Sequence, residues 1–283
     1  MFLLYKNALF YNNYSENKLN SIDFLLYNLY NKIMISERLT FYYPTNITIP
    51  ITVYHTLEND ANYFGYFKNG KPNINGFLNK LLPCLSDYRD DLHNSFLSYN
   101  QGDEETTQKI EENIYKLYFN KYDYCDDGVV NISLRINQEY YKDFLKIHDT
   151  KLQKYNMDFT NYIRSLLIEY TSKRIGQREY FYFYREINEI KNAITNHEEC
   201  CFYTHIEKLT FVPISIELSK NTGRNLIIGI TTDKETAWIL ELVALIQIFQ
   251  TEKNVEITKD DCDFAYEVLE EYYEKEDEEE CLD

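Results

Sequence analysis

Apolar and polar residues alternate strictly from residue 130 to residue 136, where Asn131, Ser133 and Arg135 occupy the polar positions. A period of two over this length is typical of a strand with one buried face. Apolar residues then recur at helical spacing over residues 140–152 and again over residues 162–170, and the expected N-caps of these two helices are Asn137 and Asp158. Residues 129–174 are therefore predicted to form one strand followed by two helices.

A second, degenerate copy of this pattern is expected over residues 46–95. Apolar residues alternate with threonine and proline over residues 47–53, and helical spacing resumes at residues 77–82 after a turn at Gly70. The strands match at an offset of 83 residues and the second helices at an offset of 85. The two strands can pair either within one chain or between two chains of a homodimer.

The copy differs from the second unit at positions that matter for its role. Pro50 cannot donate a hydrogen bond to a strand ladder. No arginine stands at the positions that match Arg135 and Arg164. The copy is therefore expected to be a structural half, while the unit that starts at residue 129 is expected to contact a ligand.

The rest of the chain predicts a helical start and a β-rich end. Helices are expected at residues 21–33, 110–118, 187–194 and 260–275, and short strands at residues 201–203, 210–216, 223–230, 237–242 and 255–257. The expected fold class is α+β, with a small antiparallel β-barrel in the second half. The expected parts are 1–128, 129–185, 186–250 and 251–283, and the last part ends in an acidic tail.

The run Asp158–Arg164, together with the strand before it, resembles the ribbon-helix-helix nucleic-acid-binding fold. In that family two strands pair, and their outward side chains enter the major groove, while helix termini contact the backbone. The resemblance implies that these residues contact nucleic acid: Asn131, Ser133, Arg135 and Thr160. An ordinary strand–helix–helix segment of a larger domain is the alternative.

Residues 186–250 resemble a WYL domain, a small Sm-like β-barrel. The matching landmarks are Ala193-Ile194 with Tyr203, the Phe211-Val212-Pro213 turn, and Gly223-Arg224 leading to Gly229. Asn225-Leu226-Ile227 replaces the Trp-Tyr-Leu of the family, and Ile239 and Leu242 replace its ligand-facing arginines. The resemblance therefore implies a barrel without the usual anionic-ligand pocket, and only Tyr203 and Arg224 remain as candidate ligand contacts.

Charge is distributed unevenly along a chain of 283 residues with net charge −17. Residues 129–185 carry 10 basic and 6 acidic residues and form the only net-positive part. Phosphate binding needs such a cluster. The candidate phosphate contacts are Arg135, Lys142, Lys146, Lys151, Lys154, Arg164, Lys173, Arg174 and Arg178. The aromatic run Tyr180–Tyr184 can stack on bases if it is exposed, and a buried segment is the alternative.

No catalytic or cofactor motif is present in the sequence. It has no P-loop, dinucleotide fingerprint, HExxH motif or nucleophile elbow, so no enzyme, cofactor or metal site is expected. The 6 cysteines lack CxxC spacing and are expected to be free thiols. No apolar run approaches the ~18 residues of a membrane span. The expected location is the cytoplasm.

A ribbon-helix-helix unit followed by a WYL domain resembles the WYL accessory proteins of type VI-D CRISPR systems. That resemblance implies a non-catalytic protein that binds single-stranded RNA and enhances RNA targeting by an RNA-guided CRISPR nuclease. One alternative is a dimeric transcriptional regulator that binds duplex DNA. Another is a factor that binds only protein, which the overall acidity favours.

Overall fold

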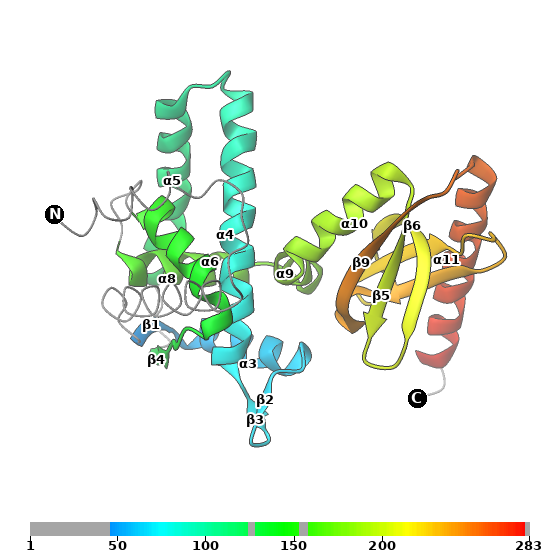
Figure 1. Cartoon of the computed structure of the whole chain (residues 1–283). Coiled ribbons are helices and arrows are strands. Elements are labelled where there is room, and N and C mark those ends of the chain that lie inside the picture. The colour runs from blue at the N-terminus through cyan, green and yellow to red at the C-terminus, as the bar shows by residue number, and fades with distance from the viewer. Residues whose placement is uncertain (1–45, 124–127, 153–157, 281–283) are drawn as a thin grey trace, which may run out of the picture. The chain divides into compact units, whose positions relative to one another are not determined.

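Helices and strands follow one another through residues 46–123, 128–152 and 158–280, which are the residues that the computed structural model describes (Figure 1). These residues belong to one unit, Thr45–Asp283. The expected α+β class is confirmed. The helix expected at residues 21–33 lies outside the described residues. Among the described residues, no helix has both the length and the apolar character needed to cross a bilayer.

The two predicted strands pair with each other inside one chain. β1 (Asn46–Pro50) and β4 (Val129–Ser133) form a two-stranded antiparallel ribbon. Both strands are shorter than expected. β1 ends at Pro50 because proline has no N–H for a ladder and its fixed φ, here −58°, suits the residue before a helix.

The first copy continues as helix, hairpin and helix. Its elements are α3 (Ile51–Tyr63), β2 (Phe67–Lys68), β3 (Lys71–Pro72) and α4 (Ile74–Tyr99), followed by α5 (Glu104–Asp123). Gly70 lies in the hairpin turn with a φ of +72°, a conformation that glycine adopts readily. Asn73 caps α4, and its side chain accepts a hydrogen bond from the Gly76 N–H at 3.1 Å. α4 and α5 lie side by side in Figure 1.

The second copy also has the predicted order. A 3-10 turn at Gln138–Tyr140 leads into α6 (Tyr141–Ile147) and a π-helical turn at His148–Leu152, and α8 (Phe159–Thr171) follows. Asp158 caps α8 as predicted, because its Oδ1 accepts from the Asn161 N–H at 2.8 Å. Asn137 does not cap the first helix with its side chain, so that prediction was wrong. α9 (Ile175–Tyr182) and α10 (Tyr184–Asn196) lead out of this copy.

The β-rich end is an open sheet of five antiparallel strands in the order β8-β7-β6-β5-β9. The strands are β5 (Glu198–Thr204), β6 (Lys208–Leu218), β7 (Asn225–Ile230), β8 (Ala237–Glu241) and β9 (Leu245–Asn254). The expected closed barrel is therefore corrected to an open sheet. The strand expected at residues 255–257 was also wrong, since β9 ends just before it.

A helix closes the core of this sheet. α11 (Lys259–Glu280) packs against β7 and β8, and Ala265, Leu269 and Tyr273 meet the buried side chains of Leu226 and Ile228. The α11 side of β7 is covered in this way, and all six residues of the strand are buried. Because the helix covers this face, apolar burial does not require β8 and β9 to meet.

Candidate nucleic-acid interface

The β1–β4 ribbon has one apolar face and one polar face. Ile47, Ile49 and Ile132 are buried, at 0%, 0% and 6% exposure. Between them along the strands, Asn131 and Ser133 are exposed, as alternation requires. The polar face of the second copy is therefore outward, as the sequence predicted.

The two copies meet at equivalent residues. The register places Thr48 directly opposite Asn131, and the Thr48 Oγ1 donates a hydrogen bond to the Asn131 Oδ1 at 2.6 Å. These two positions are separated by the same 83 residues that relate the two strands in sequence. The ribbon is thus a pseudo-symmetric pair made by one chain. Asn46 lies opposite Ser133 and adds a further exposed polar side chain to the outward face.

The second helix of each copy holds the strand segment of the other copy. Arg164 of α8 donates from Nε to the Thr48 carbonyl of β1 at 2.8 Å. Asn79 of α4 donates to the Arg135 carbonyl at 2.9 Å. Arg164 and Asn79 are related by the offset of 85 residues seen between the two helices. The copies therefore interlock, and neither strand is positioned by its own helix alone.

The backbone of Arg135 is fixed while its side chain is exposed. The Asn75 side chain pairs with the Arg135 backbone, accepting from its N–H at 2.6 Å and donating to its carbonyl at 3.1 Å. The guanidinium group is exposed beyond the end of β4. Asn75 and Asn79 were not predicted from sequence. The only available signal was that Asn79 stands at the position equivalent to Arg164.

Thr160 lies in the first turn of α8 and is half-buried. The same helix end carries the Asp158 carboxylate, which accepts from the Asn161 N–H. A carboxylate at a helix N-terminus satisfies the amides that a phosphate would use and repels that phosphate. We therefore do not assign Thr160 to the interface.

Arg178 forms an ion pair with a buried carboxylate, that of Asp60. Its Nε and Nη2 lie 2.7 Å and 3.0 Å from the two carboxylate oxygens of Asp60, and the exposed fractions of the two side chains are 17% and 2%. The Tyr170 hydroxyl donates to the same carboxylate at 2.7 Å. Burial, followed by the Asp60 charge, holds the pKa of Tyr170 well above its usual value. Arg178 therefore stabilises the interior rather than facing a ligand.

The remaining basic candidates differ in their surroundings. Lys173 is half-buried, and its carbonyl accepts from the Arg178 Nη1 at 2.7 Å. Arg174 is exposed at the start of α9, and Lys142 is exposed on α6. Lys146 forms ion pairs with Asp87 and Asp90 at 3.0 Å and 3.3 Å. The side chains of Lys151 and Lys154 lie outside the described part of the chain.

The aromatic run is mostly buried. Tyr180 is half-buried, and residues 181–184 have exposed fractions of 3–6%. Tyr182 stacks against Phe64 with a centroid separation of 4.1 Å. These rings form the core between α3, α4 and α9, so they do not provide an open platform for bases. The buried alternative considered for this run is the observed one.

The candidate ligand contacts on the sheet engage separate partners. Tyr203 on β5 is 38% exposed and packs edge-on against Phe249 at 5.6 Å. Arg224 lies over the Tyr63 ring at 5.0 Å and pairs with Glu241 at 3.5 Å. Neither contact resembles an anion pocket, because each involves an aromatic ring or a carboxylate.

Asn225, at the start of β7, joins the sheet to α9. Its backbone N–H and side-chain amide donate to Oε2 of the buried Glu179 at 2.8 Å and 3.0 Å. Tyr63 donates to the other oxygen of Glu179 at 2.5 Å. The helix approaches so closely at Gly176 that a Cβ there would lie 2.4 Å from the Gly223 carbonyl oxygen. Asn225 therefore serves a structural contact between the sheet and α9.

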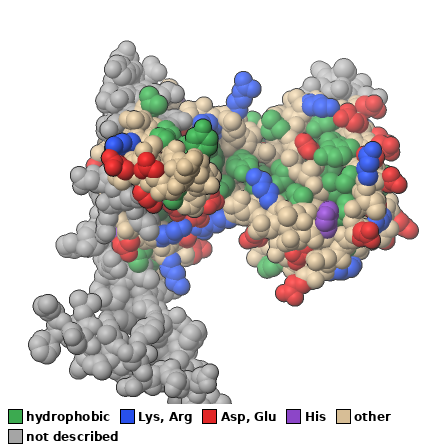
Figure 2. Space-filling model, turned by 90° about the horizontal axis from the view of Figure 1, so that it is seen from above, with side chains coloured by type: hydrophobic (Ala, Val, Ile, Leu, Met, Phe, Trp, Pro, Cys, Tyr) green, Lys and Arg blue, Asp and Glu red, His purple; other side chains and the backbone are tan. Residues whose placement is uncertain are grey.

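Acidic side chains dominate the surface of the β-sheet part, which includes α11. On the face shown in Figure 2 they line the outer edge of the β-sheet part. The exposed acids of α11 include Glu267, Glu270 and Glu274. Such a surface repels phosphate. The outward face of the ribbon, with Arg135 at its end, is therefore the better candidate for nucleic acid.

Comparison with known proteins gives one informative likeness. No family model matches the chain, and no curated protein matches it. A solved structure described as "Crystal structure of a CRISPR Cas-related protein" is similar, with a TM-score of 0.55 and 16% sequence identity. The match covers 76% of this chain and 64% of that chain, so this chain spans less than two thirds of its neighbour. At this identity the likeness establishes a shared fold.

Proposed function

We propose that this protein is a non-catalytic accessory protein of a CRISPR system and binds single-stranded RNA through the outward face of the β1–β4 ribbon. The observation that carries the proposal is this intrachain ribbon, whose exposed side chains are Asn46, Asn131, Ser133 and Arg135. Amides, hydroxyls and a guanidinium group are the groups that hydrogen-bond base edges and phosphates.

The arrangement of the two copies supports a ribbon-helix-helix assignment. Members of that fold place a paired ribbon on two interlocked helix pairs. Here Arg164 and Asn79 reach across from one copy to the other, and Thr48 meets its counterpart Asn131. One chain can therefore build a unit that otherwise needs a dimer. We also propose that two such chains associate, and a measurement of the molecular mass in solution tests this.

The shared fold with a CRISPR Cas-related protein supports the CRISPR assignment. The resemblance of the sequence to type VI-D accessory proteins supports single-stranded RNA as ligand and an RNA-guided nuclease as partner. A cytoplasmic location follows from the same assignment. Among the residues that the structure describes, the outward face carries one cation, Arg135, so binding depends on base contacts more than on charge.

Duplex DNA is the second candidate ligand. A two-stranded antiparallel ribbon fits the major groove, and the β1–β4 ribbon has that form. The two ligands can be told apart by the salt slope, which is the slope of log affinity against log salt concentration. Each phosphate contact changes this slope by about 0.7 for single strands and by about 0.9 for duplex DNA.

Fluorescence anisotropy across a salt series tests the proposal. Labelled single-stranded RNA, single-stranded DNA and duplex DNA are titrated with wild type, Arg135→Ala and Asn131→Asp. Arg135→Ala is expected to lower RNA affinity about fivefold to tenfold and to reduce the salt slope by about 0.7. Asn131→Asp adds a carboxylate to the outward face at nearly constant shape and is expected to weaken RNA binding further.

Lys109→Ala is the matched control, since Lys109 is an exposed cation on α5 that pairs with Glu105. It is expected to leave RNA binding unchanged. Preference for duplex DNA would instead support the alternative function, a transcriptional regulator. Equal loss in the control and ribbon variants, or no binding of any nucleic acid at low salt, would overturn the ribbon as the interface.

A further inference from the structure

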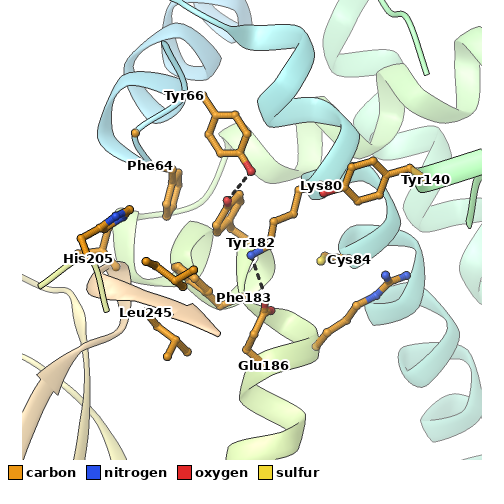
Figure 3. A pocket seen from close by; sticks show the side chains of 14 residues that line it. Phe64, Tyr66, Lys80, Cys84, Tyr140, Tyr182, Phe183, Glu186, His205 and Leu245 are labelled. Atoms are coloured by element: carbon orange, nitrogen blue, oxygen red, sulfur yellow. Dashed lines mark hydrogen bonds and ion pairs between the residues drawn. The ribbon is translucent and has the colours of Figure 1, made fainter. Parts of the chain in front are cut away.

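A pocket opens between the helical part and the sheet. Its volume is about 520 Å³, and α4, α10 and the start of β9 contribute to its walls. Small-molecule sites usually measure about 300–1,000 Å³ and combine aromatic walls with a few placed polar groups. Figure 3 shows aromatic side chains, Lys80 and Glu186 converging on this space.

Aromatic rings form much of the wall. Phe64, Tyr66, Tyr140 and Tyr182 line the pocket, and the hydroxyls of Tyr66 and Tyr182 lie 2.8 Å apart (Figure 3). Burial raises the pKa of Tyr140 to about 12. Burial also raises the pKa of Tyr182, and the nearby Tyr66 adds to the shift. The hydroxyls of Tyr140 and Tyr182 therefore stay neutral at physiological pH. Tyr182 is covered by Phe64, so the half-buried rings of Tyr66 and Tyr140 supply the flat surface that a ligand can reach.

A carboxylate in the pocket has an unused acceptor. Lys80 Nζ donates to Glu186 Oε1 at 2.8 Å and lies 4.5 Å from the centre of the Tyr182 ring. Glu186 Oε2 is buried without a hydrogen-bond partner among the described residues. A buried charged acceptor of this kind is costly unless a donor meets it. Because Oε2 itself has almost no accessible surface, the Glu186 side chain, which is 18% exposed, must turn toward the pocket before a ligand's N–H group can meet this oxygen.

We propose that this pocket binds one amine-bearing nucleobase: adenine, cytosine or guanine. Such a base offers a flat ring for the aromatic walls and an exocyclic amine for Glu186 Oε2, as acidic side chains accept from the cytosine amine in duplexes. Uracil presents carbonyl oxygens on both sides of its ring N–H, and these face repulsion from the carboxylate. The inference rests on the proposed RNA binding only in that a bound strand is one source of the base, and a free nucleoside is the other.

Titration calorimetry of the full chain with adenosine, cytidine and uridine tests the base itself. Adenosine and cytidine are expected to bind at least about tenfold more tightly than uridine, since a charge-assisted hydrogen bond accounts for about that factor. Glu186→Gln is expected to weaken adenosine and cytidine binding about tenfold and to remove the preference. Equal binding of the three nucleosides by wild type, or no binding of any, would overturn the proposal.

Glu186→Gln also loses the ion pair with Lys80 and can misfold. A second variant, at the rim of the pocket, tests the proposal independently. Ile246 lines the pocket and is 49% exposed, so Ile246→Trp can obstruct the opening with little effect on the core. Phe249→Trp is the control, because Phe249 lies on the same strand with the same exposure but outside the pocket lining. Only the first is expected to lower adenosine binding. Equal effects of the two variants would contradict the pocket.

RNA oligomers that contain only adenosine, only cytidine or only uridine distinguish the two sources of the base, a bound strand and a free nucleoside. If a bound strand supplies the base, the oligomers show the nucleoside preference and Ile246→Trp weakens their binding. If a free nucleoside is the ligand, the preference holds for nucleosides and Ile246→Trp leaves oligomer binding unchanged. Nucleoside binding without any oligomer binding would overturn the proposed function while leaving the base pocket in place.

Discussion

Two arginines from the same basic segment, Arg135 and Arg178, have opposite surroundings. Arg135 follows the ribbon, and its side chain is exposed while its backbone is held by Asn75. Arg178 is 17% exposed and forms a two-point ion pair with the buried Asp60. Both count equally toward the positive charge of residues 129–185. The net charge of a segment therefore gives only the number of its cations. Whether each cation can bind a ligand depends on acidic residues that lie far away in sequence, as Asp60 does from Arg178.

Arg164 stands between these two cases. The sequence suggested Arg164 as a phosphate contact, and in the structure its Nε donates to the backbone carbonyl of Thr48 in the ribbon. Its Nη1 also donates to the Asn161 side chain at 2.8 Å. Arg164 therefore positions the interface rather than providing an open phosphate contact.

The largest expected effect comes from Arg178→Met, which removes one partner of the buried pair. Asp60 would then remain buried as an uncompensated charge, and the free energy of unfolding is expected to fall by about 3–5 kcal/mol. Urea denaturation measures this. Arg174→Met is the matched control, because Arg174 is exposed on the same helix start and its replacement is expected to cost less than about 0.5 kcal/mol. Similar losses in the two variants would break the comparison.

Arg164→Met is expected to have an intermediate effect. The Thr48 carbonyl loses a charge-assisted donor, so unfolding becomes easier by about 1–2 kcal/mol. RNA affinity is expected to fall because the ribbon is less well positioned, while the salt slope stays constant because no phosphate contact is removed. A slope reduced as much as in Arg135→Ala would place Arg164 among the phosphate contacts instead.

The smallest expected effect concerns a cation paired at the surface. Lys234 lies 2.7 Å from Asp261, and the Thr258 N–H donates to the same carboxylate at 2.7 Å. The Lys234 contact, followed by the Thr258 N–H, lowers the pKa of Asp261 to about 2. Asp261→Asn is expected to cost about 1 kcal/mol at pH 7, the usual contribution of a helix-capping interaction.

The pH dependence of this effect has a defined sign. The folded-state pKa of Asp261 lies below the unfolded value of about 3.9, so the contribution is full above that value and is lost as the pH falls toward 2. Thermal melts of wild type and Asp261→Asn are therefore expected to converge between pH 4 and pH 2. A difference that persists at pH 2 would show that the carboxylate charge is not its cause.

Local pattern was sufficient for most of the elements. Alternation predicted β1 and β4, helical spacing predicted α4, α8, α10 and α11, and the Asp158 cap was confirmed. The errors are missed elements, ends and closures: α3 and β9 were not predicted, Pro50 stops β1 early, and residues 255–257 follow β9 instead of forming a strand. The sheet also stays open. These outcomes depend on packing against α3 and α11, which neighbouring residues in the sequence do not encode.

The sequence by itself determined that Asn131, Ser133 and Arg135 share one face, because side chains alternate along any strand. Only the tertiary structure decided that β1 is the partner of β4, that Asn75 and Asn79 hold the segment after β4, and that Asp60 takes Arg178 out of the interface. The physical reason is distance along the chain. Alternation and capping act over a few residues, whereas strand pairing and the neutralisation of a buried charge join segments that are remote in sequence.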